Sequence, residues 1–342
     1  MSRALFLFVL STAIFAASQP KSLFYMIDRP DSVKSFLDHA DKVDILVPAW
    51  YHVDGNGLVW GGPDPDVMKT ASQHHVPVMP IVALMTQVDL HKLFTTPVAR
   101  TAFIAALIGE SKKNGYSGFQ IDFEDVSWTD RDLLSSLVAD TAAALHKENL
   151  QLTIATVPNA PGVPGHSSYS HWLYENWRGG YDLKALAQSA DLICLMTYDQ
   201  NTRWTMPGPV AGYPWTQQNL DYALQFVPKE KLSLGIPVYG YHWFAGDPGK
   251  DEKPNPTAEY IGQQQVDGYV AAYHPHVEWD SSDRVAWFYF YRDDYREWVF
   301  YTDKHGFQER LNLVRDRGLQ GFCSWVLGAE DPEIWSLLPS HK

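Results

Sequence analysis

Polar and apolar residues alternate between Ser117 and Asp125, and the polar ones are of types that do chemistry. The segment reads Ser-Gly-Phe-Gln-Ile-Asp-Phe-Glu-Asp, which places polar side chains at Gln120, Asp122 and Glu124. Because successive side chains of a β-strand point to opposite faces, these three share one face and the apolar residues share the other. Same-face neighbours lie about 6 to 7 Å apart, so the two carboxyl groups interact without merging into one unit. The pattern predicts a pair of acids suited to proton transfer.

Glu124 is the better candidate for a general acid. A semi-buried carboxyl group beside a like charge has a raised pKa, so we expect Glu124 to hold its proton near neutral pH. The segment taken alone also fits a second interpretation, in which it is an amphipathic edge strand or its carboxylates cap neighbouring helices. The elements that position the segment decide between the two.

Short apolar, β-branched runs recur along the chain and alternate with stretches of helical period. Such alternation implies parallel strands joined by right-handed crossovers, and eight units in one chain predict an α/β protein with a closed (β/α)8 TIM barrel. In that barrel the polar face of the fourth run points inward, close to the end of the strand where catalytic residues lie. The eight runs are Leu23 to Ile27, Val43 to Ala49, Val76 to Ala83, Gly118 to Phe123, Leu152 to Val157, Leu192 to Thr197, Leu232 to Val238 and Gly321 to Val326.

The spacing between the seventh and eighth runs breaks this rhythm. About 80 residues separate them, whereas about 25 to 35 complete a β/α unit. The excess predicts a small α+β insertion at about 244–304, with an antiparallel sheet indicated by the alternating patterns over 285–291 and 298–301. We expect the insertion to wall one side of the ligand-binding face. The expected division is therefore a signal peptide over 1–18 and a barrel over 19–342 that contains the insertion.

The fourth run resembles the fourth strand of the family 18 glycoside hydrolases, which carries the motif Asp-x-x-Asp-x-Asp-x-Glu. The matching positions here are Ser117, Gln120, Asp122 and Glu124, so the last two agree and the first two depart. The resemblance implies that Glu124 is the acid/base and that Asp122 orients the 2-acetamido group of the substrate. The carbonyl oxygen of that group then attacks the anomeric carbon in place of a protein nucleophile. Gln120 is expected at the substrate.

Three further segments resemble the same family in the same order along the chain. Met196-Thr197-Tyr198-Asp199 matches its Met-x-Tyr-Asp motif, which implies that Tyr198 steadies the acetamido group and that Met196 and Asp199 contact substrate. Tyr239 directly follows the seventh run and is expected to contact substrate, and Trp325 lies near the end of the eighth run, where the resemblance places it under the sugar. Other aromatic residues at or just beyond predicted strand ends are expected to stack on sugar rings, although core packing explains each about equally well. They are Tyr25, Trp50 and Trp243.

The N-terminus and the composition indicate where the protein works. Arg3, an apolar run from Ala4 to Ala17 and small residues at Ala16 and Ser18 predict a secretory signal cleaved before Gln19, and hence a secreted or periplasmic protein without a stable membrane anchor. An uncleaved anchor is the alternative. The net charge of −13 disfavours nucleic acid and anionic membranes as partners. Cys194 and Cys323 lie in apolar runs and are expected to be buried thiols, and the spacing of the 13 histidines predicts no metal site and no cofactor.

These observations favour a secreted, monomeric glycoside hydrolase that cleaves β-linked N-acetylglucosamine-containing glycans of the chitin, chitooligosaccharide or peptidoglycan type. The resemblance is closest to the spore-cortex and peptidoglycan-lytic branch of the family. Two alternatives remain. One is a non-catalytic, chitinase-like lectin that binds the same sugars. The other is a barrel glycosidase that uses Asp199 or Asp125 against Glu124 as a conventional pair of carboxylates.

Overall fold

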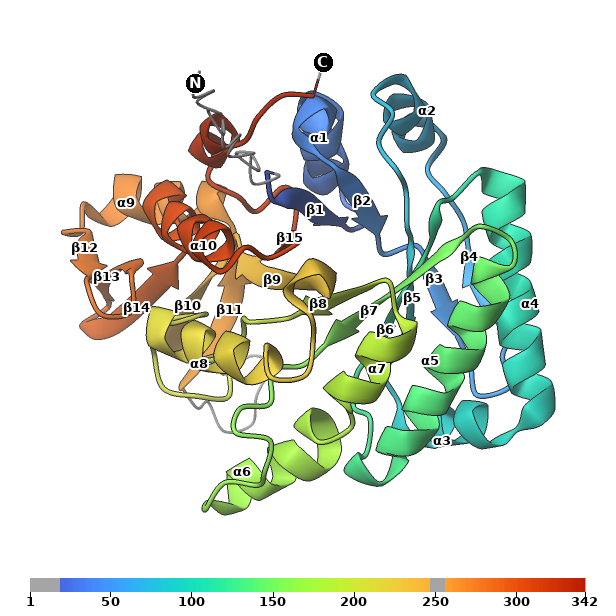
Figure 1. Cartoon of the computed structure of the whole chain (residues 1–342). Coiled ribbons are helices and arrows are strands. Elements are labelled where there is room, and N and C mark those ends of the chain that lie inside the picture. Colours follow the sequence, from blue (N-terminus) through green and yellow to red (C-terminus); the bar gives the residue numbers. More distant parts are fainter. Residues whose placement is uncertain (1–18, 247–255, 342) are drawn as a thin grey trace, which may run out of the picture.

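Eight parallel strands form a barrel in the computed structural model, which describes residues 19–246 and 256–341 (Figure 1). The predicted signal peptide lies outside the described residues. Hydrogen bonds join the strands in the order β2-β1-β15-β9-β8-β7-β6-β5. The predicted barrel is confirmed, and each predicted run overlaps one strand. The strands are β1 (Lys21–Met26), β2 (Ile45–Pro48), β5 (Ile81–Leu84), β6 (Gly118–Phe123), β7 (Gln151–Thr156), β8 (Leu192–Leu195), β9 (Leu232–Pro237) and β15 (Gly321–Trp325).

The barrel closes between β2 and β5 through a single parallel bridge from Leu46 to Val78. The prediction that a strand begins at Val76 was wrong, because regular pairing in β5 starts only at Ile81. Pro77 and Pro80 lack the amide hydrogen that a strand ladder requires. A short continuation of β2, β3 (Tyr51–Val53), pairs with β5 and with β4 (Val59–Gly61).

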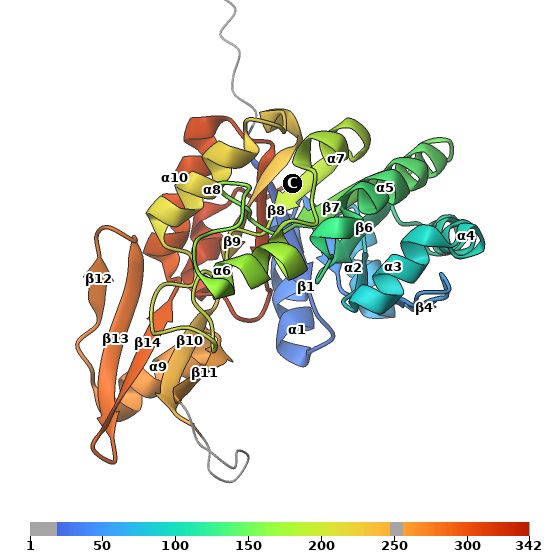
Figure 2. The same cartoon turned by 90° about the horizontal axis from the view of Figure 1, so that it is seen from below.

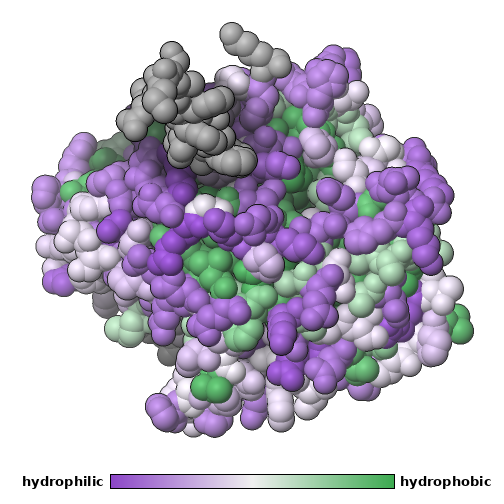
Figure 3. Space-filling model, viewed as in Figure 1, coloured by the Kyte–Doolittle hydropathy of each residue, from purple (hydrophilic) through white to green (hydrophobic). Residues whose placement is uncertain are grey.

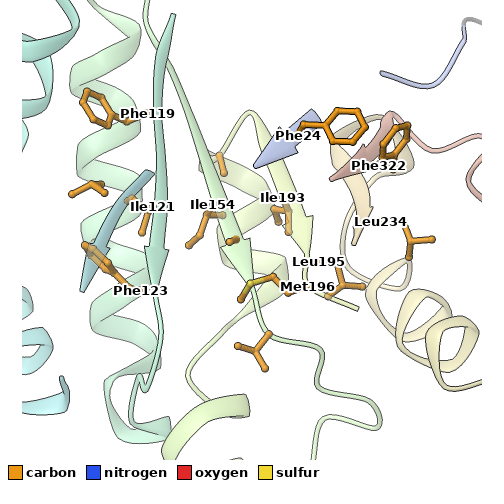
Figure 4. Packing of buried hydrophobic residues seen from close by; sticks show 14 of the residues in the cluster. Phe24, Phe119, Ile121, Phe123, Ile154, Ile193, Leu195, Met196, Leu234 and Phe322 are labelled. Carbon is orange, nitrogen blue, oxygen red and sulfur yellow. The ribbon is translucent and has the colours of Figure 1, made fainter. Parts of the chain in front are cut away.

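Helices surround the barrel, and the main core lies between them and the strands (Figure 1). Phe119, Ile121 and Phe123 point from β6 toward this helical layer and are at most 1% exposed (Figure 4). Burying each of these side chains stabilises the fold by about 2 kcal/mol, and it fixes the opposite face of β6 toward the barrel interior. The outer helices are α1 (Pro30–His39), α2 (Pro65–Gln73), α3 (Gln87–Thr95), α4 (Pro97–Asn114), α5 (Arg131–His146), α7 (Leu183–Ser189), α8 (Tyr213–Ala223) and α10 (Lys304–Arg317).

The predicted insertion between the last two barrel strands is confirmed as an α+β unit. Its five-stranded antiparallel sheet has the order β11-β10-β14-β13-β12 and spans residues 240–301, with a smaller apolar core of its own. Figure 2 shows this sheet standing to one side of the barrel. The elements are β10 (Gly240–Ala245), β11 (Pro256–Ile261), α9 (Gln263–Tyr273), β12 (Glu278–Asp280), β13 (Val285–Arg292) and β14 (Tyr295–Tyr301).

Strands β8 and β9 approach each other closely at Gly235. A Cβ atom at this position would lie 2.5 Å from the Leu195 carbonyl oxygen and 2.6 Å from the Thr197 amide nitrogen. The Thr197 hydroxyl also donates a hydrogen bond of 2.7 Å to the Gly235 carbonyl oxygen. A side chain here would push apart the two strands that lead to Tyr198 and Tyr239.

Replacing Gly235 with Ala is therefore expected to lower the free energy of unfolding by about 1 to 3 kcal/mol, as for other overpacked cores. Urea denaturation of both proteins measures the difference. Gly109→Ala is the control, because the site lies on α4 and has nothing within 4 Å of the added carbon. This control should gain about 0.5 to 1 kcal/mol from the better helix former. Equal stability of Gly235→Ala and the wild type would show that the strands can separate without cost.

Candidate active site

Strand β6 presents its polar residues to the barrel interior. Gln120 is fully buried and donates hydrogen bonds to the Thr153 hydroxyl (3.1 Å) and the Cys194 sulfur (3.3 Å), on the strands one and two places away. Asp122, 7% exposed, lies two residues further along the same face. One oxygen of Asp122, Oδ1, is buried and has no hydrogen-bond partner among the described residues. That oxygen is free to accept a hydrogen bond from a ligand.

Glu124 follows β6 directly and is partly buried at the mouth of the barrel. The indole N–H of Trp177 donates a hydrogen bond of 3.1 Å to Glu124 Oε2. Trp177 belongs to η3 (Tyr174–Arg178), a π-helical turn that continues α6 (Ser168–Leu173) in the segment after β7. The carboxyl group is thus oriented by a residue more than fifty positions away in sequence.

Burial is the main electrostatic influence on both acids. It raises the pKa of Asp122 well above its usual value, and the neighbouring Glu124 charge raises it further. Burial also raises the pKa of Glu124, with smaller contributions from the charges of Asp199 and Asp125, while the Trp177 hydrogen bond opposes the rise. Because the pKa of Glu124 is raised, this carboxyl group at the mouth of the barrel keeps its proton to higher pH, which suits it to protonate a leaving group.

Asp199 and Tyr198 stand beside these acids at the end of β8. The Tyr239 hydroxyl donates a hydrogen bond of 2.6 Å to Asp199 Oδ1, and burial raises the pKa of Asp199. Tyr198 is buried, and its ring lies 6.3 Å from that of Tyr239. Asp122 and Glu124 lie close enough to Tyr198 to raise the pKa of its phenol further. The Asp199 carboxyl group is therefore hydrogen-bonded to Tyr239. Tyr198 lies close to Asp122 and Glu124.

An open hollow of about 400 Å³ extends from Glu124, and we call it the Glu124 hollow. Glu124, Asp125 and Asp199 line it, and the insertion contributes Tyr241 from β10. Its other walls come from the α6–η3 segment and from the loop after Asp199. These walls include Tyr169, Trp172, Arg178, Arg203 and Trp204. Asp122, Tyr198 and Trp325 do not line this hollow.

Trp325 and Tyr25 pack against each other in the barrel interior. Their ring centroids are 5.4 Å apart, and Trp325 is partly exposed whereas Tyr25 is 1% exposed. Trp325 can therefore offer a ring face to a sugar, while Tyr25 supports it from within. Met196 is also buried and does not line the Glu124 hollow.

The structure places three other predicted contact residues behind the surface. Trp50 packs against Tyr116 in the core between strands and helices, so the expectation that it stacks on sugar was wrong. The chain turns between β2 and β3 at this residue, which directs the ring outward. Trp243 is 4% exposed and donates a hydrogen bond of 3.3 Å to the carbonyl oxygen of Thr205, a residue of the hollow wall. Tyr239 is 2% exposed and donates its hydrogen bond to Asp199. Trp243 and Tyr239 therefore support residues that line the Glu124 hollow.

Sequence reasoning missed Trp177 and its neighbours, because they follow no strand or helix period. The available signal is the segment Trp177-Arg178-Gly179-Gly180-Tyr181. A Cβ atom at Gly180 would lie 2.7 Å from the Val126 carbonyl oxygen, and the Tyr181 hydroxyl donates a hydrogen bond of 2.6 Å to the Phe123 carbonyl oxygen. These contacts hold the segment against the end of β6, and they bring Trp177 to Glu124.

Replacing Trp177 with Phe is expected to move the alkaline limb of the pH profile of kcat/KM to higher pH. A hydrogen bond donated to the ionised carboxylate stabilises that form and lowers its pKa. Its loss therefore raises the pKa of Glu124, and the protonated acid persists to higher pH. The profile is measured beside that of Trp172→Phe, a change in the same hollow that leaves the hydrogen bond intact. A limb that stays in place or moves to lower pH would contradict this assignment.

Two other features are absent from the described residues. No group of three or more His, Cys, Asp or Glu side chains within residues 19–246 and 256–341 could hold a metal ion. No helix in the same residues is long and apolar enough to cross a bilayer. On the face seen in Figure 3, hydrophilic residues predominate and apolar residues form small scattered groups.

A (β/α)8 barrel with an acid at the carboxyl end of its fourth strand and a second acid below it defines a glycosidase-type barrel. The model for the family "Glycosyl hydrolases family 18" matches residues 22–330. The chain therefore belongs to family 18 of the glycosyl hydrolases and is a glycoside hydrolase.

Individual relatives are distant but cover most of the chain. YdhD of Bacillus subtilis (strain 168), whose name describes it as a sporulation-specific glycosylase, is 25% identical over 315 residues, which is 89% of this chain and 70% of YdhD. The cortical fragment-lytic enzyme of the same organism is 22% identical over 252 residues, and the match spans about half (54%) of its length. A chitinase from Chromobacterium violaceum ATCC 12472 has a similar structure, with a TM-score of 0.82 and 25% identity over 93% of this chain and 97% of that chain.

Proposed function

We propose that the protein is a retaining hydrolase of β-linked N-acetylglucosamine-containing glycans, with catalysis assisted by the substrate. The observation that carries this proposal is the buried, unpartnered oxygen of Asp122 beside Glu124. A 2-acetamido group supplies the N–H donor that this oxygen lacks. When Asp122 accepts that hydrogen bond, the acetamido carbonyl oxygen is directed toward the anomeric carbon.

Each residue then has one task in the reaction. Glu124 gives its proton to the glycosidic oxygen as the bond to the leaving group breaks. The acetamido oxygen forms the new bond to the anomeric carbon, and Asp122 stabilises the positive charge that develops on the amide. Glu124 then accepts a proton from the water that opens the oxazoline ring, and the sugar is released with retained configuration. Tyr198 steadies the acetamido group, and Trp325 offers its ring face beneath the sugar.

The substrate class is supported by the relatives, two of which are named for a spore-cortex activity or a sporulation glycosylase and one for chitin. We propose that the substrate is a polymer or oligomer of the chitin or peptidoglycan type. Nuclear magnetic resonance of chitotetraose hydrolysis tests the reaction, since a retaining enzyme releases the β-anomer first. A thiazoline analogue of the cyclised sugar should bind far more tightly than product. Inversion, or weak thiazoline binding, would favour a conventional pair of carboxylates.

We also propose that the protein is exported, on the strength of Arg3 and the apolar run that follows it. Sequencing the N-terminus of the mature protein from an extracellular or periplasmic fraction tests this. The expected first residue is Gln19, and a retained Met1 would contradict cleavage.

A further inference from the structure

Two arginines line the Glu124 hollow without serving its acids. Arg178 stands on the η3 wall next to Trp177, and Arg203 stands on the loop after Asp199. Burial raises the pKa values of Glu124, Asp125 and Asp199, and the other influences on them come from neighbouring acids, Trp177 and tyrosines rather than from an arginine. If these arginines were present to neutralise the acids, they would lie against them. Their placement in the same hollow needs another explanation.

Arg178 is the arginine whose position most requires an anionic partner. Its side chain is partly buried, and its Nε–H is enclosed with no hydrogen-bond partner among the described residues. The phenol of Tyr169 is the ionisable group close enough to affect it. A buried cation without an anionic partner is costly, and such groups are normally paired. An anion in the hollow would supply the partner.

Arg203 offers a second cation, on the loop after Asp199 that lines the same hollow. Its guanidinium carbon lies 4.3 Å from the centre of the Trp204 ring, and Trp204 is 74% exposed. Stacking on an aromatic ring holds the guanidinium flat and leaves its N–H groups directed outward. The chain as a whole carries a net charge of −13, so an anionic glycan is repelled at long range and needs local cations to bind.

In the proposed mechanism, the hollow falls on the leaving-group side of the cleavage point. Asp122, Tyr198 and Trp325, which the proposed mechanism assigns to the sugar that carries the acetamido nucleophile, lie outside it, whereas Glu124 opens into it. A general acid protonates the bond to the leaving group. The next unit of the glycan therefore enters the hollow from Glu124 outward.

Resting on the proposed hydrolase function, we infer that Arg178 and Arg203 bind a carboxylate carried by the leaving-group sugar. The preferred substrate is then an acidic glycan in which N-acetylglucosamine alternates with a carboxylate-bearing sugar. Guanidinium groups recognise carboxylates through paired, charge-assisted hydrogen bonds, which neutral chitin cannot offer. The carboxylate could stand on a lactyl ether, as in muramic acid, or at C6, as in a uronic acid.

The test compares substrates that differ only in this charge. A peptide-free tetrasaccharide of alternating N-acetylglucosamine and N-acetylmuramic acid is assayed beside its carboxamide derivative and beside chitotetraose, with an N-acetylglucosamine–glucuronate tetrasaccharide as the second carboxylate source. We expect kcat/KM for one of the two acids to exceed that for the carboxamide by about 10-fold or more. A preference for either acid supports the inference and tells where the carboxylate sits. Equal rates on acid and carboxamide would overturn it.

Variants separate recognition from general damage. Arg178→Gln and Arg203→Gln should each lose about 10-fold or more on the preferred acid and clearly less than that on chitotetraose. Arg178→Lys, which keeps the charge, should recover part of the loss. Arg315→Gln, an exposed change on α10, is the control. Equal losses on charged and neutral substrates would assign the arginines to the fold alone and contradict the inference.

Failure of the proposed function would look different. If the wild type cleaves none of these glycans, the hydrolase proposal fails. Calorimetric binding to the Glu124→Gln protein then still tests whether the hollow binds a carboxylate of the glycan. Tighter binding of the acid than of the carboxamide, lost in Arg178→Gln, supports the inference. Equal binding overturns it.

Discussion

Replacing Glu124 with Gln is expected to lower kcat by about 10²- to 10⁴-fold while leaving substrate affinity close to that of the wild type. Glutamine has nearly the same shape and still accepts the hydrogen bond that the Trp177 indole donates. It cannot, however, give a proton to the glycosidic oxygen. Single-turnover rates on chitotetraose, together with calorimetric binding, measure the two effects separately.

The matched control for this variant is Glu175→Gln. Glu175 lies on η3, two residues before Trp177, and its side chain is exposed and does not line the Glu124 hollow. It should keep wild-type turnover. A Glu124→Gln enzyme that retains most of its activity would move the acid role to another carboxyl group, with Asp199 the first candidate.

Replacing Asp122 with Asn is expected to lower kcat by about 10²- to 10³-fold, as when a preorganised electrostatic contact is removed from an active site. The carboxylate both accepts the acetamido N–H and offsets the positive charge that forms as the acetamido oxygen attacks. Asparagine preserves the volume of a side chain that is only 7% exposed, so the fold should be retained. The loss should fall on kcat more than on KM, because the charge develops in the transition state.

Substrates without an acetamido group provide the control for Asp122→Asn. Any slow hydrolysis of a glucoside with a good leaving group should be affected far less than that of the N-acetylglucosaminide. Asp132→Asn, a change at a largely exposed side chain on α5, should leave both rates unchanged. Equal losses on both substrates would mean that Asp122 acts on the sugar ring or on Glu124 rather than on the acetamido group.

The barrel could be predicted from the sequence because each of its strands repeats a simple physical pattern. The apolar face of β6, formed by Phe119, Ile121 and Phe123, requires a covering layer, and the alternation then directs Asp122 inward. The insertion was evident from spacing alone. The late start of β5 was not, because the hydrophobic pattern through Val76 conceals the effect of two prolines on pairing.

The residues that line the Glu124 hollow beyond the strand ends could not be predicted, because they come from segments between the barrel strands. Trp177, Arg178 and Arg203 reach the Glu124 hollow through turns whose geometry depends on contacts distant in sequence. Position at a strand end was likewise too weak a rule for aromatic residues. It predicted that Trp50 stacks on sugar, as the resemblance predicted for Trp325, whereas Trp50 is buried in the core and Trp325 is partly exposed. A Trp-Arg-Gly-Gly sequence is informative only once it is known which strand the glycines approach.

The two buried cysteines of the barrel can report how fast the barrel opens. Cys194 and Cys323 are free, fully enclosed by the barrel strands, and burial raises the pKa of the Cys323 thiol well above its usual value. A sulfhydryl reagent must also reach the sulfur it attacks, and the closed barrel leaves neither sulfur accessible. Alkylation of these two sulfurs therefore proceeds only as fast as the barrel opens. The alkylation rates of Cys194, on the sixth barrel strand, and of Cys323, on the eighth, therefore measure the kinetic stability of the barrel at two positions.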